Sequence, residues 1–365
     1  MRDAADLAYM EMAYGLAEKA RGRASPNPYV GSVIVRRNAI AGYGYHEETG
    51  KPHAEIVAMR RAGSRTRGAT VYITLEPCVH WGRTPPCVDS LIEAKPRRVV
   101  VSAYDPNPVV FKKGVRKLHL AGIKVTAGLL AEKNVRLNEA YNKFITRRIP
   151  FVAAKAALSM DGKMAARTMD SRWISARETR EYVHLLRGEY DAVMAGIGTV
   201  LHDDPILTVR HSNWKNKKIA RVILDSRLRF PLDARLLSTV GDGPLLIFTG
   251  KGIPSRKKED LEKRGAEVIP LDAPPKTGMH AVLCELGKRD ISSVLVEGGS
   301  RLLTSIIDGR LADKIYLTLS PILIGGEQAP LFYGGEGVDR VRDSLRLRNT
   351  SLFRIGEDTI LEGYF

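Results

Sequence analysis

Hydrophobic and polar positions in the first part of the chain follow two different periods. Leu7, Met10, Tyr14 and Ala17 recur at the 3.6-residue spacing of an amphipathic helix, which we expect over residues 6–20. Short apolar runs bounded by polar turns predict strands instead. The expected strands cover residues 30–35, 39–45, 69–75, 98–102 and 123–126, and further helices are expected over residues 53–59 and 87–94.

In the second part of the chain, apolar runs of strand length alternate with helical segments. This alternation favours a mostly parallel sheet with helices on its faces. Arg147-Arg148-Ile149-Pro150 separates the two patterned regions, so we expect an α/β protein with domains at residues 1–148 and 149–365. The strands expected in the second domain cover residues 151–156, 192–196, 221–225, 244–249, 293–297 and 314–319, and its helices include residues 176–187 and 300–307.

Composition agrees with a globular chain of two domains. The 365 residues are 44% hydrophobic and 27% charged, which is enough apolar material for two ordinary cores. Acidic residues stand near the N-terminus where a signal peptide would be apolar, and no apolar stretch is long enough to span a membrane. We therefore expect no membrane partner.

The positive charge is concentrated in the first domain. The whole chain carries +16, and residues 1–148 hold 25 Lys and Arg against 13 Asp and Glu, a balance of +12. Such a surface is compatible with a phosphorylated small molecule, with a nucleic acid, or with a basic solvated surface that has no partner. Charge alone does not choose among the three.

Three residues with metal-binding chemistry occur in the first domain, each between an expected strand and an expected helix. His53, Cys78 and Cys87 supply one imidazole and two thiolates, which leaves the fourth position of a tetrahedral Zn²⁺ open for water. Zinc lowers the pKa of such a water, and Glu55 is placed to carry its proton to a departing ammonia. This arrangement is the general signature of zinc deaminases acting on nucleobase-like rings.

The spacing of the two cysteines departs from the general signature. Eight residues separate Cys78 from Cys87, where the signature has two. Two buried structural thiols and a surface histidine are the alternative interpretation. The combination of His-x-Glu with Pro-Cys, each between a strand and a helix, favours zinc. With these two thiols bound to metal, Cys284 has no disulfide partner, which favours the reducing cytoplasm.

Three further patterns are weak on local sequence alone. Asn27, between two prolines, is suited to reading a ring substituent, but local sequence alone favours a role in forming the turn. Gly196-Ile-Gly198 is half of a dinucleotide fingerprint, with leucine at the position of the third glycine. Glu297-Gly-Gly-Ser300 joins an expected strand to a helix, where backbone N–H groups suit a pyrophosphate.

Taken in order along the chain, these segments resemble one family, the bifunctional riboflavin-biosynthesis deaminase–reductases. The matching segments are residues 21–35, 53–55, 75–78, 82–87, 105–108, 159–163, 171–174, 195–200, 203–210 and 296–299. The long cysteine spacing is also what this family shows. The resemblance covers essentially the whole chain and implies a cytidine-deaminase-like three-layer domain followed by a dihydrofolate-reductase-like domain that uses NADPH.

The resemblance also implies roles for particular residues. Those expected to contact NADPH are Ala157, Trp173, Thr199, Asp203, Ser226, Gly299, Ser300, Arg301, Leu302, Leu303, Thr304 and Ser305. Those expected to contact the substrate are Asn27, Ser171, Arg187, Leu207, Arg210 and Glu297, with Lys155 near the transferred hydride. Arginine suits the substrate's phosphate, because a planar guanidinium forms paired charge-assisted bonds. The resemblance further implies pairing of chains through the reductase domain.

The chain departs from the family pattern at a few positions. Lys112 stands where the family has a glycine, and Val79 and Trp81 stand where Ser and an aromatic residue or His are common. We expect these changes to tune the pocket and to leave the chemistry intact.

The resemblance implies a two-step enzyme of riboflavin synthesis. It would deaminate 2,5-diamino-6-(5-phosphoribosylamino)pyrimidin-4-one and then reduce the ribosyl group to ribityl with NADPH. Two alternatives stay open at this point. One is a deaminase of transfer-RNA bases, suggested by the basic first domain, and the other is a non-catalytic scaffold with a structural zinc.

Overall fold

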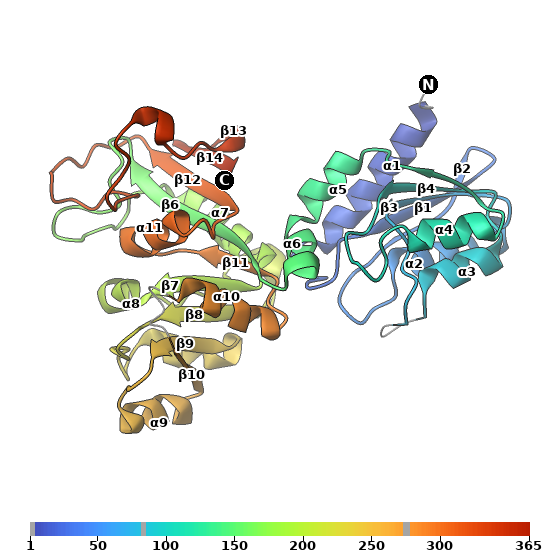
Figure 1. Ribbon diagram of the computed structural model, residues 1–365. Coiled ribbons are helices and arrows are strands. Elements are labelled where there is room, and N and C mark those ends of the chain that lie inside the picture. The colour runs from blue at the N-terminus through green and yellow to red at the C-terminus, as the bar shows by residue number, and fades with distance from the viewer. Residues whose placement is uncertain (1–3, 82–84, 273–277) are drawn as a thin grey trace. The chain divides into compact units, whose positions relative to one another are not determined.

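The computed structural model describes residues 4–81, 85–272 and 278–365 (Figure 1). Contacts between Cα atoms divide the chain into two compact units, Met1–Arg148 and Ile149–Phe365. Each unit has its own sheet and its own core.

The first unit is built on a sheet whose described strands lie in the order β2-β1-β3-β4-β5. The first three strands in this order pair antiparallel, whereas β3, β4 and β5 run parallel. All five were expected from the sequence, within a residue or two at their ends. They are β1 (Gly31–Arg36), β2 (Ala39–Tyr45), β3 (Thr70–Leu75), β4 (Arg98–Ala103) and β5 (Lys124–Ala127).

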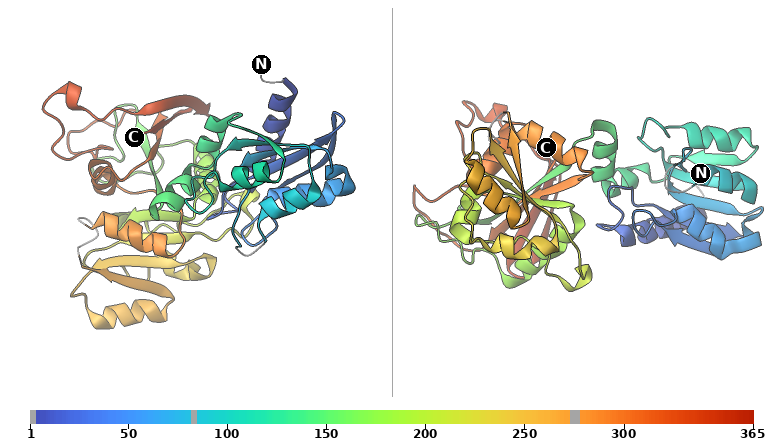
Figure 2. Two further views of the ribbon diagram at one scale, coloured as in Figure 1. Left: turned by 45° about the vertical axis from the view of Figure 1, so that its right-hand side comes forward. Right: turned by 90° about the horizontal axis from the view of Figure 1, so that it is seen from below.

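Helices cover both faces of this sheet, because its strands are apolar on both sides (Figures 1 and 2). Val33, Tyr72 and Val100 face one layer, which contains α1, and their sequence neighbours Ile34 and Ile73 face the other, which contains α2, α3 and α4. The result is the three-layer arrangement that was expected. The helices are α1 (Ala4–Ala17), α2 (Ala54–Ala62), α3 (Cys87–Ala94), α4 (Lys113–Leu120), α5 (Ala131–Leu137) and α6 (Glu139–Arg147).

The second unit contains a wider sheet, ordered β10-β9-β8-β7-β11-β6-β12-β14-β13 among the described residues. Strands β10 to β12 in this order are parallel, and the hairpin β13–β14 adds two antiparallel strands at one edge. The strands are β6 (Phe151–Ser159), β7 (Ala192–Gly196), β8 (Ala220–Leu224), β9 (Leu245–Gly250), β10 (Ala266–Leu271), β11 (Ser293–Val296), β12 (Lys314–Ser320), β13 (Arg348–Ile355) and β14 (Asp358–Tyr364).

The helices of the second unit connect the parallel strands. Side chains of α10 and α11, among them Leu286 and Ile306, pack against Val152 and Val222 in the main core. The mostly parallel sheet is confirmed, although β10, β13 and β14 were not identified from the sequence. The helices are α7 (Arg177–Glu189), α8 (Ile197–Asp203), α9 (Ser255–Lys263), α10 (Met279–Lys288) and α11 (Ser300–Asp308).

None of the described helices has the length and apolar composition that crossing a membrane requires.

Candidate active sites

The three expected metal ligands come together at one edge of the first sheet. His53 immediately precedes α2, Cys78 follows β3, and Cys87 is the first residue of α3. Their ligand atoms all lie within 4.8 Å of one another. These ligands are distant in the sequence, but they converge because the starts of α2 and α3 and the end of β3 lie at this same edge.

The geometry of this cluster fits zinc. His53 Nδ1 lies 3.1 Å from Cys87 Sγ and 3.6 Å from Cys78 Sγ. Tetrahedral Zn²⁺ with bonds of roughly 2.0–2.1 Å to nitrogen and 2.3 Å to sulfur places such atoms about 3.6 Å apart. A hydrogen bond from the Cys87 thiol, aided by His53, lowers the pKa of the Cys78 thiol well below its usual value, although burial acts in the opposite direction. Cys78 is therefore ready to bind a cation as a thiolate.

Glu55 is placed for proton transfer beside these ligands. It lies in the first turn of α2 and is only 3% exposed. Burial raises the pKa of its carboxyl to about 7, while the charge of His53 acts in the opposite direction. A bound cation would also favour the carboxylate, so Glu55 can exchange a proton near neutral pH.

A second histidine, which the sequence analysis did not single out, positions Asn27. The amide Nδ2 of Asn27 lies 3.0 Å from His46 Nε2, and His46 Nδ1 lies 3.3 Å from the carbonyl of Pro52. Burial lowers the pKa of His46, so its neutral ring donates from Nδ1 and accepts at Nε2. The ring centroids of His46 and His53 are 5.2 Å apart, which places Asn27 close to the metal ligands.

In the second unit, an ion pair at the end of β11 joins two of the predicted substrate residues, Arg187 and Glu297. The Arg187 guanidinium binds both carboxylate oxygens of Glu297, at 2.5 and 3.0 Å, and donates to the carbonyl of Thr208 at 3.1 Å. Burial raises the pKa of Glu297, but the charge and hydrogen bonds of Arg187 outweigh burial and lower it. Burial lowers the pKa of Lys155, whose charge also interacts with Glu297.

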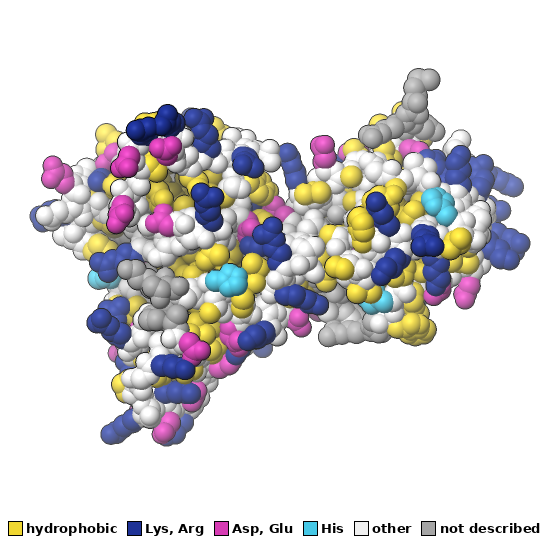
Figure 3. Space-filling model, viewed as in Figure 1, with side chains coloured by type: hydrophobic (Ala, Val, Ile, Leu, Met, Phe, Trp, Pro, Cys, Tyr) yellow, Lys and Arg dark blue, Asp and Glu magenta, His cyan; other side chains and the backbone are white. Residues whose placement is uncertain are grey.

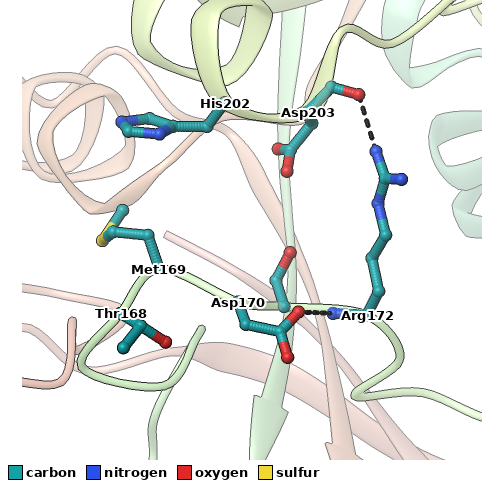
Figure 4. Close-up of a pocket in the computed structure, with 7 residues that line it drawn as sticks. Thr168, Met169, Asp170, Arg172, His202 and Asp203 are labelled. Carbon is teal, nitrogen blue, oxygen red and sulfur yellow. Dashed lines mark hydrogen bonds between the residues drawn. The ribbon is translucent and has the colours of Figure 1, made fainter.

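A pocket of about 330 Å³ lies between the loop that joins β6 to α7 and the C-terminal end of α8 (Figure 4). Arg172 spans it, with its backbone N–H 3.2 Å from Asp170 Oδ1 and its guanidinium 2.7 Å from the carbonyl of Asp203. Burial raises the pKa of Asp203. The lining residues are Thr168, Met169, Asp170, Ser171, Arg172, His202 and Asp203, which include the predicted residues Ser171 and Asp203.

Comparison with known proteins assigns both halves. The family described as "RibD C-terminal domain" matches residues 150–361, and the "Cytidine and deoxycytidylate deaminase zinc-binding region" matches residues 3–103. The riboflavin biosynthesis protein RibD of Aquifex aeolicus is 40% identical over 98% of this chain and 97% of its own length. The chain belongs to the RibD family.

Other RibD proteins agree over the same length. The Escherichia coli protein is 35% identical over 97% of each chain. A crystal form of Acinetobacter baumannii RibD has a TM-score of 0.89 at 34% identity, covering 99% of this chain and 98% of its own. A Thermotoga maritima protein described as a diaminohydroxyphosphoribosylaminopyrimidine deaminase and 5-amino-6-(5-phosphoribosylamino)uracil reductase has a TM-score of 0.85 at 34% identity, with the same coverage.

Membership of the RibD family confirms the expected fold class and the bifunctional activity. The chain is a zinc-binding deaminase and an NADPH-dependent reductase of riboflavin biosynthesis. The transfer-RNA deaminase alternative is wrong, because the RibD relatives match along the whole chain, including the reductase half. The scaffold alternative is likewise set aside.

Part of the excess positive charge of this RibD chain lies away from the metal cluster. Arg36 ends β1, Arg67 and Arg97 precede β3 and β4, and Lys124 begins β5. Because β3, β4 and β5 are parallel and β1 is antiparallel to β3, these residues share one sheet edge, opposite the edge where Cys78 follows β3. Figure 3 shows many exposed Lys and Arg side chains on the visible face of the first unit.

The loop that carries Lys112 is held by a buried carboxylate. Glu76 accepts backbone N–H bonds from Lys112 at 2.9 Å, Val115 at 3.0 Å and Asp105 at 3.3 Å. Lys112 has a φ of 61°, a left-handed conformation that favours glycine, so the glycine expected here from the family pattern would have a physical reason. The Lys112 ammonium lies 5.1 Å from the ring centroid of Phe111 and 5.6 Å from that of Tyr104. Residues 82–84 of the neighbouring 82–87 segment lie outside the described residues.

The residues expected to bind NADPH gather along one edge of the second sheet. Thr199 lies in α8 after β7, Ser226 follows β8, and Gly299 precedes α11 after β11. These parallel strands neighbour each other, so their carboxyl ends share an edge, the usual place for a nucleotide. Ala157 lies on β6, in register with Thr318 of β12, and Trp173 is 66% exposed with Arg180 stacked 4.4 Å from its ring centroid.

Some of the residues expected to contact NADPH or the substrate have buried side chains, so only their backbone atoms are available to a ligand. Leu302 and Leu303 pack in the main core, at 8% and 0% exposure, so their side chains do not reach a ligand. Leu207 is also buried, and its φ is 56°. The other predicted residues of this segment lie in the first two turns of α11, where the free backbone N–H groups and the helix dipole favour an anion. They are Ser300, Arg301, Thr304 and Ser305.

Proposed function

We propose that the first unit deaminates 2,5-diamino-6-(5-phosphoribosylamino)pyrimidin-4-one and that the second unit reduces the product's ribosyl group. The observation that carries the first step is the convergence of His53, Cys78 and Cys87 beside the buried Glu55. These three residues would hold a zinc ion, which would lower the pKa of its bound water towards neutrality.

In the deamination, water adds to the ring carbon that bears the amine, the C–N bond breaks, and ammonia leaves. Glu55 takes the proton from the attacking water and delivers it to the departing nitrogen, for which a pKa near 7 is well matched. Asn27, oriented by His46 at 3.0 Å, hydrogen-bonds the pyrimidine.

When bound in the second unit, NADPH would supply the hydride for C1′ of the ribosyl group, and a proton delivered to the ring oxygen would complete the opening of the sugar to a ribityl chain. Arg187 and Arg210 bind the phosphate, Glu297 orients Arg187 through its bidentate ion pair, and Ser171 and Leu207 complete the substrate contacts. Lys155, next to Glu297, lies near the reacting carbon and holds a proton that burial makes easier to release.

The NADPH contacts are part of the proposal. Thr199, Asp203 and Ser226 bind the cofactor together with the start of α11, residues 299–305. Support comes from their common position at the carboxyl ends of parallel strands and from the pocket beside Asp203. Ala157 and Trp173 flank the ring of NADPH that carries the hydride.

The experiment that tests the proposal is a mass spectrum of the products formed from the diaminopyrimidinone with and without NADPH. We expect the deaminated uracil without NADPH, and the deaminated ribityl compound with it. Deaminated but unreduced product in the presence of NADPH would contradict the reductase assignments, and unchanged substrate with zinc bound would contradict the deaminase assignments.

We also propose a cytoplasmic enzyme whose chains pair through the second unit. Cys78 and Cys87 must stay reduced to bind zinc, which favours a reducing compartment. Strand β13 lies at an edge of the sheet and exposes most of its side chains, with Leu352 66% exposed. Sedimentation equilibrium should give a dimer or larger assembly, and a monomer at micromolar concentration would contradict the pairing.

A further inference from the structure

A histidine that the sequence analysis passed over lies in the middle of the proposed phosphate-binding residues. His184 and Arg187 are three residues apart on α7, so their side chains share one face of the helix. The Arg210 guanidinium Nη2 lies 3.1 Å from His184 Nε2, and the Arg210 backbone nitrogen lies 3.3 Å from His184 Nδ1. The His184 imidazole therefore contacts both the backbone N–H and the guanidinium of Arg210.

The ring of His184 is uncharged at neutral pH. Burial lowers the pKa of His184 to about 4, and the positive charges of Arg187 and Arg210 act in the same direction. Glu297 and a hydrogen bond to the backbone of Thr208 oppose this shift but do not reverse it. A neutral imidazole has one N–H donor and one lone pair, so only one of its two nitrogens can accept.

The lone pair belongs to Nε2. A guanidinium can only donate, so a hydrogen on Nε2 would set two donors against each other at 3.1 Å. A hydrogen on Nδ1 removes this conflict and suits the hydrogen bond to the Thr208 backbone, but it gives up the longer contact, in which the Arg210 backbone N–H points at Nδ1 across 3.3 Å. Of the two contacts with Arg210, the one at Nε2 is both shorter and charge-assisted, which makes it the stronger.

The other partner of Arg210 is neutral as well. Its Nη1 donates to the hydroxyl of Thr208 at 3.2 Å. Arg187, by contrast, is paired with the carboxylate of Glu297 through two hydrogen bonds. Among the described residues Arg210 forms no ion pair, so it keeps its full charge for an external anion while its guanidinium is held in place.

We propose that His184 is a positioning residue of the reductase site. Its neutral ring fixes the Arg210 guanidinium for the phosphate of the substrate without cancelling its charge, which an acidic residue at this position would do. The inference rests on the proposed function, in which Arg210 contacts the substrate phosphate.

Three variants of the full-length protein distinguish two effects on Arg210: holding its guanidinium in place and neutralising its charge. His184→Leu removes the acceptor, His184→Gln keeps a neutral acceptor, and His184→Glu provides an acceptor that carries a negative charge. The reductase reaction is measured at saturating NADPH with 5-amino-6-(5-phosphoribosylamino)uracil and with its dephosphorylated riboside. Thermal melting and the KM for NADPH serve as folding controls, because both report on the second unit, which carries the substitution.

For the phosphorylated substrate, we expect His184→Leu to raise KM about tenfold with kcat within about twofold, the size of losing one hydrogen bond to a charged group. His184→Gln should stay within about threefold of the parent KM, and His184→Glu should raise KM at least as much as His184→Leu. The KM for the riboside and for NADPH should not change in any variant.

A merely structural role predicts a different result. If His184→Leu changes KM equally for the phosphorylated substrate and the riboside, or if His184→Glu behaves like the parent, the positioning role is wrong. Arg210→Ala separates this failure from that of the proposed function. An unchanged KM in Arg210→Ala would overturn the phosphate contact itself, whereas a raised KM there with an unchanged KM in His184→Leu would overturn only the role of His184. Should His184→Leu fail to fold, the comparison of the Gln and Glu variants decides.

Discussion

At the scale of single residues, the two sites use burial in opposite ways. Burial raises the pKa of Glu55 to about 7, so that an acid becomes able to exchange protons at neutral pH. Burial lowers the pKa of His184 to about 4, so that a base stays neutral beside two arginines. In each case the surroundings of one side chain set which proton it carries.

Replacing Glu55 with Gln should abolish deamination and leave zinc bound. The amide keeps the size of the carboxyl but cannot accept the proton of the attacking water, so we expect a loss of about 10²–10⁴-fold in kcat. Ammonia release and zinc content by atomic absorption measure the two effects. Ammonia release at the parent rate would contradict the role of Glu55.

Replacements of Lys112 should separate backbone strain from side-chain contact. Lys112→Gly relieves a φ of 61° but loses the contacts with Phe111 and Tyr104, so these effects roughly cancel. Lys112→Ala keeps the strain and loses the contacts, and we expect it to be about 1 kcal/mol less stable than Lys112→Gly. Thermal melting of the two variants checks this order, which equal melting temperatures would refute.

At the scale of elements, the ends of helices and strands carry the chemistry. The zinc ligands occupy the start of α2, the start of α3 and the end of β3. The loop before α4 is drawn over this edge by Glu76, and Gly114 of α4 passes so close that an added Cβ would lie 2.3 Å from the carbonyl oxygen of Pro77. Packing of α4 therefore holds the turn that precedes Cys78.

Gly114→Ala should disturb this packing and the zinc site with it. The added methyl meets backbone atoms that cannot move aside, so we expect a loss of stability of about 1–3 kcal/mol and weaker zinc retention against a chelator. Gly15→Ala in α1 is the matched control, since no atom lies within 4 Å of its added Cβ. The control should gain up to about 1 kcal/mol from helix propensity. Equal zinc retention in both variants would show that α4 does not support the site.

The start of α1 is anchored by Asp6, and this anchor should depend on pH. Burial raises the pKa of Asp6, but hydrogen bonds and charge from Arg98, with a hydrogen bond from Tyr72, lower it below its usual value of 3.8. The stabilisation is therefore present above about pH 3.8 and lost as the pH falls through the lower folded-state pKa. Asp6→Asn should cost about 1–3 kcal/mol at pH 7, and this cost should shrink as the pH falls below about 3.8. Urea unfolding followed by circular dichroism at several pH values measures this loss of stability. A loss that does not change with pH would contradict the role of the Asp6 charge.

Elements with a strong hydrophobic pattern were predictable from the sequence, and exposed elements were not. Buried strands such as β3 and β8 have continuous apolar runs, whereas β13 exposes most of its side chains and has no such run. The zinc ligands were predictable because metal chemistry restricts residue type and spacing. His46 and His184 were not, since their roles depend on contacts with Asn27 and Arg210, which are 19 and 26 residues away.

At the scale of the whole molecule, the two catalytic sites belong to separate compact units. Each has its own sheet, and the zinc ligands and the reductase residues do not share an element. Loss of one site should therefore leave the chemistry of the other intact.

Removal of zinc tests this independence. After treatment with 1,10-phenanthroline, we expect ammonia release to stop, while NADPH-dependent reduction of 5-amino-6-(5-phosphoribosylamino)uracil continues at the rate of the untreated protein. NADPH oxidation followed by absorbance measures the second reaction, and readdition of zinc should restore the first. Parallel loss of both activities would contradict the separation.

The union of two compact units in one chain has a consequence for the cell. Every translated molecule delivers one deaminating and one reducing catalyst, so gene expression cannot change their stoichiometry. Whether the intermediate between the two reactions accumulates therefore depends on the ratio of the two turnover rates, and selection can adjust that ratio only through the residues of each site.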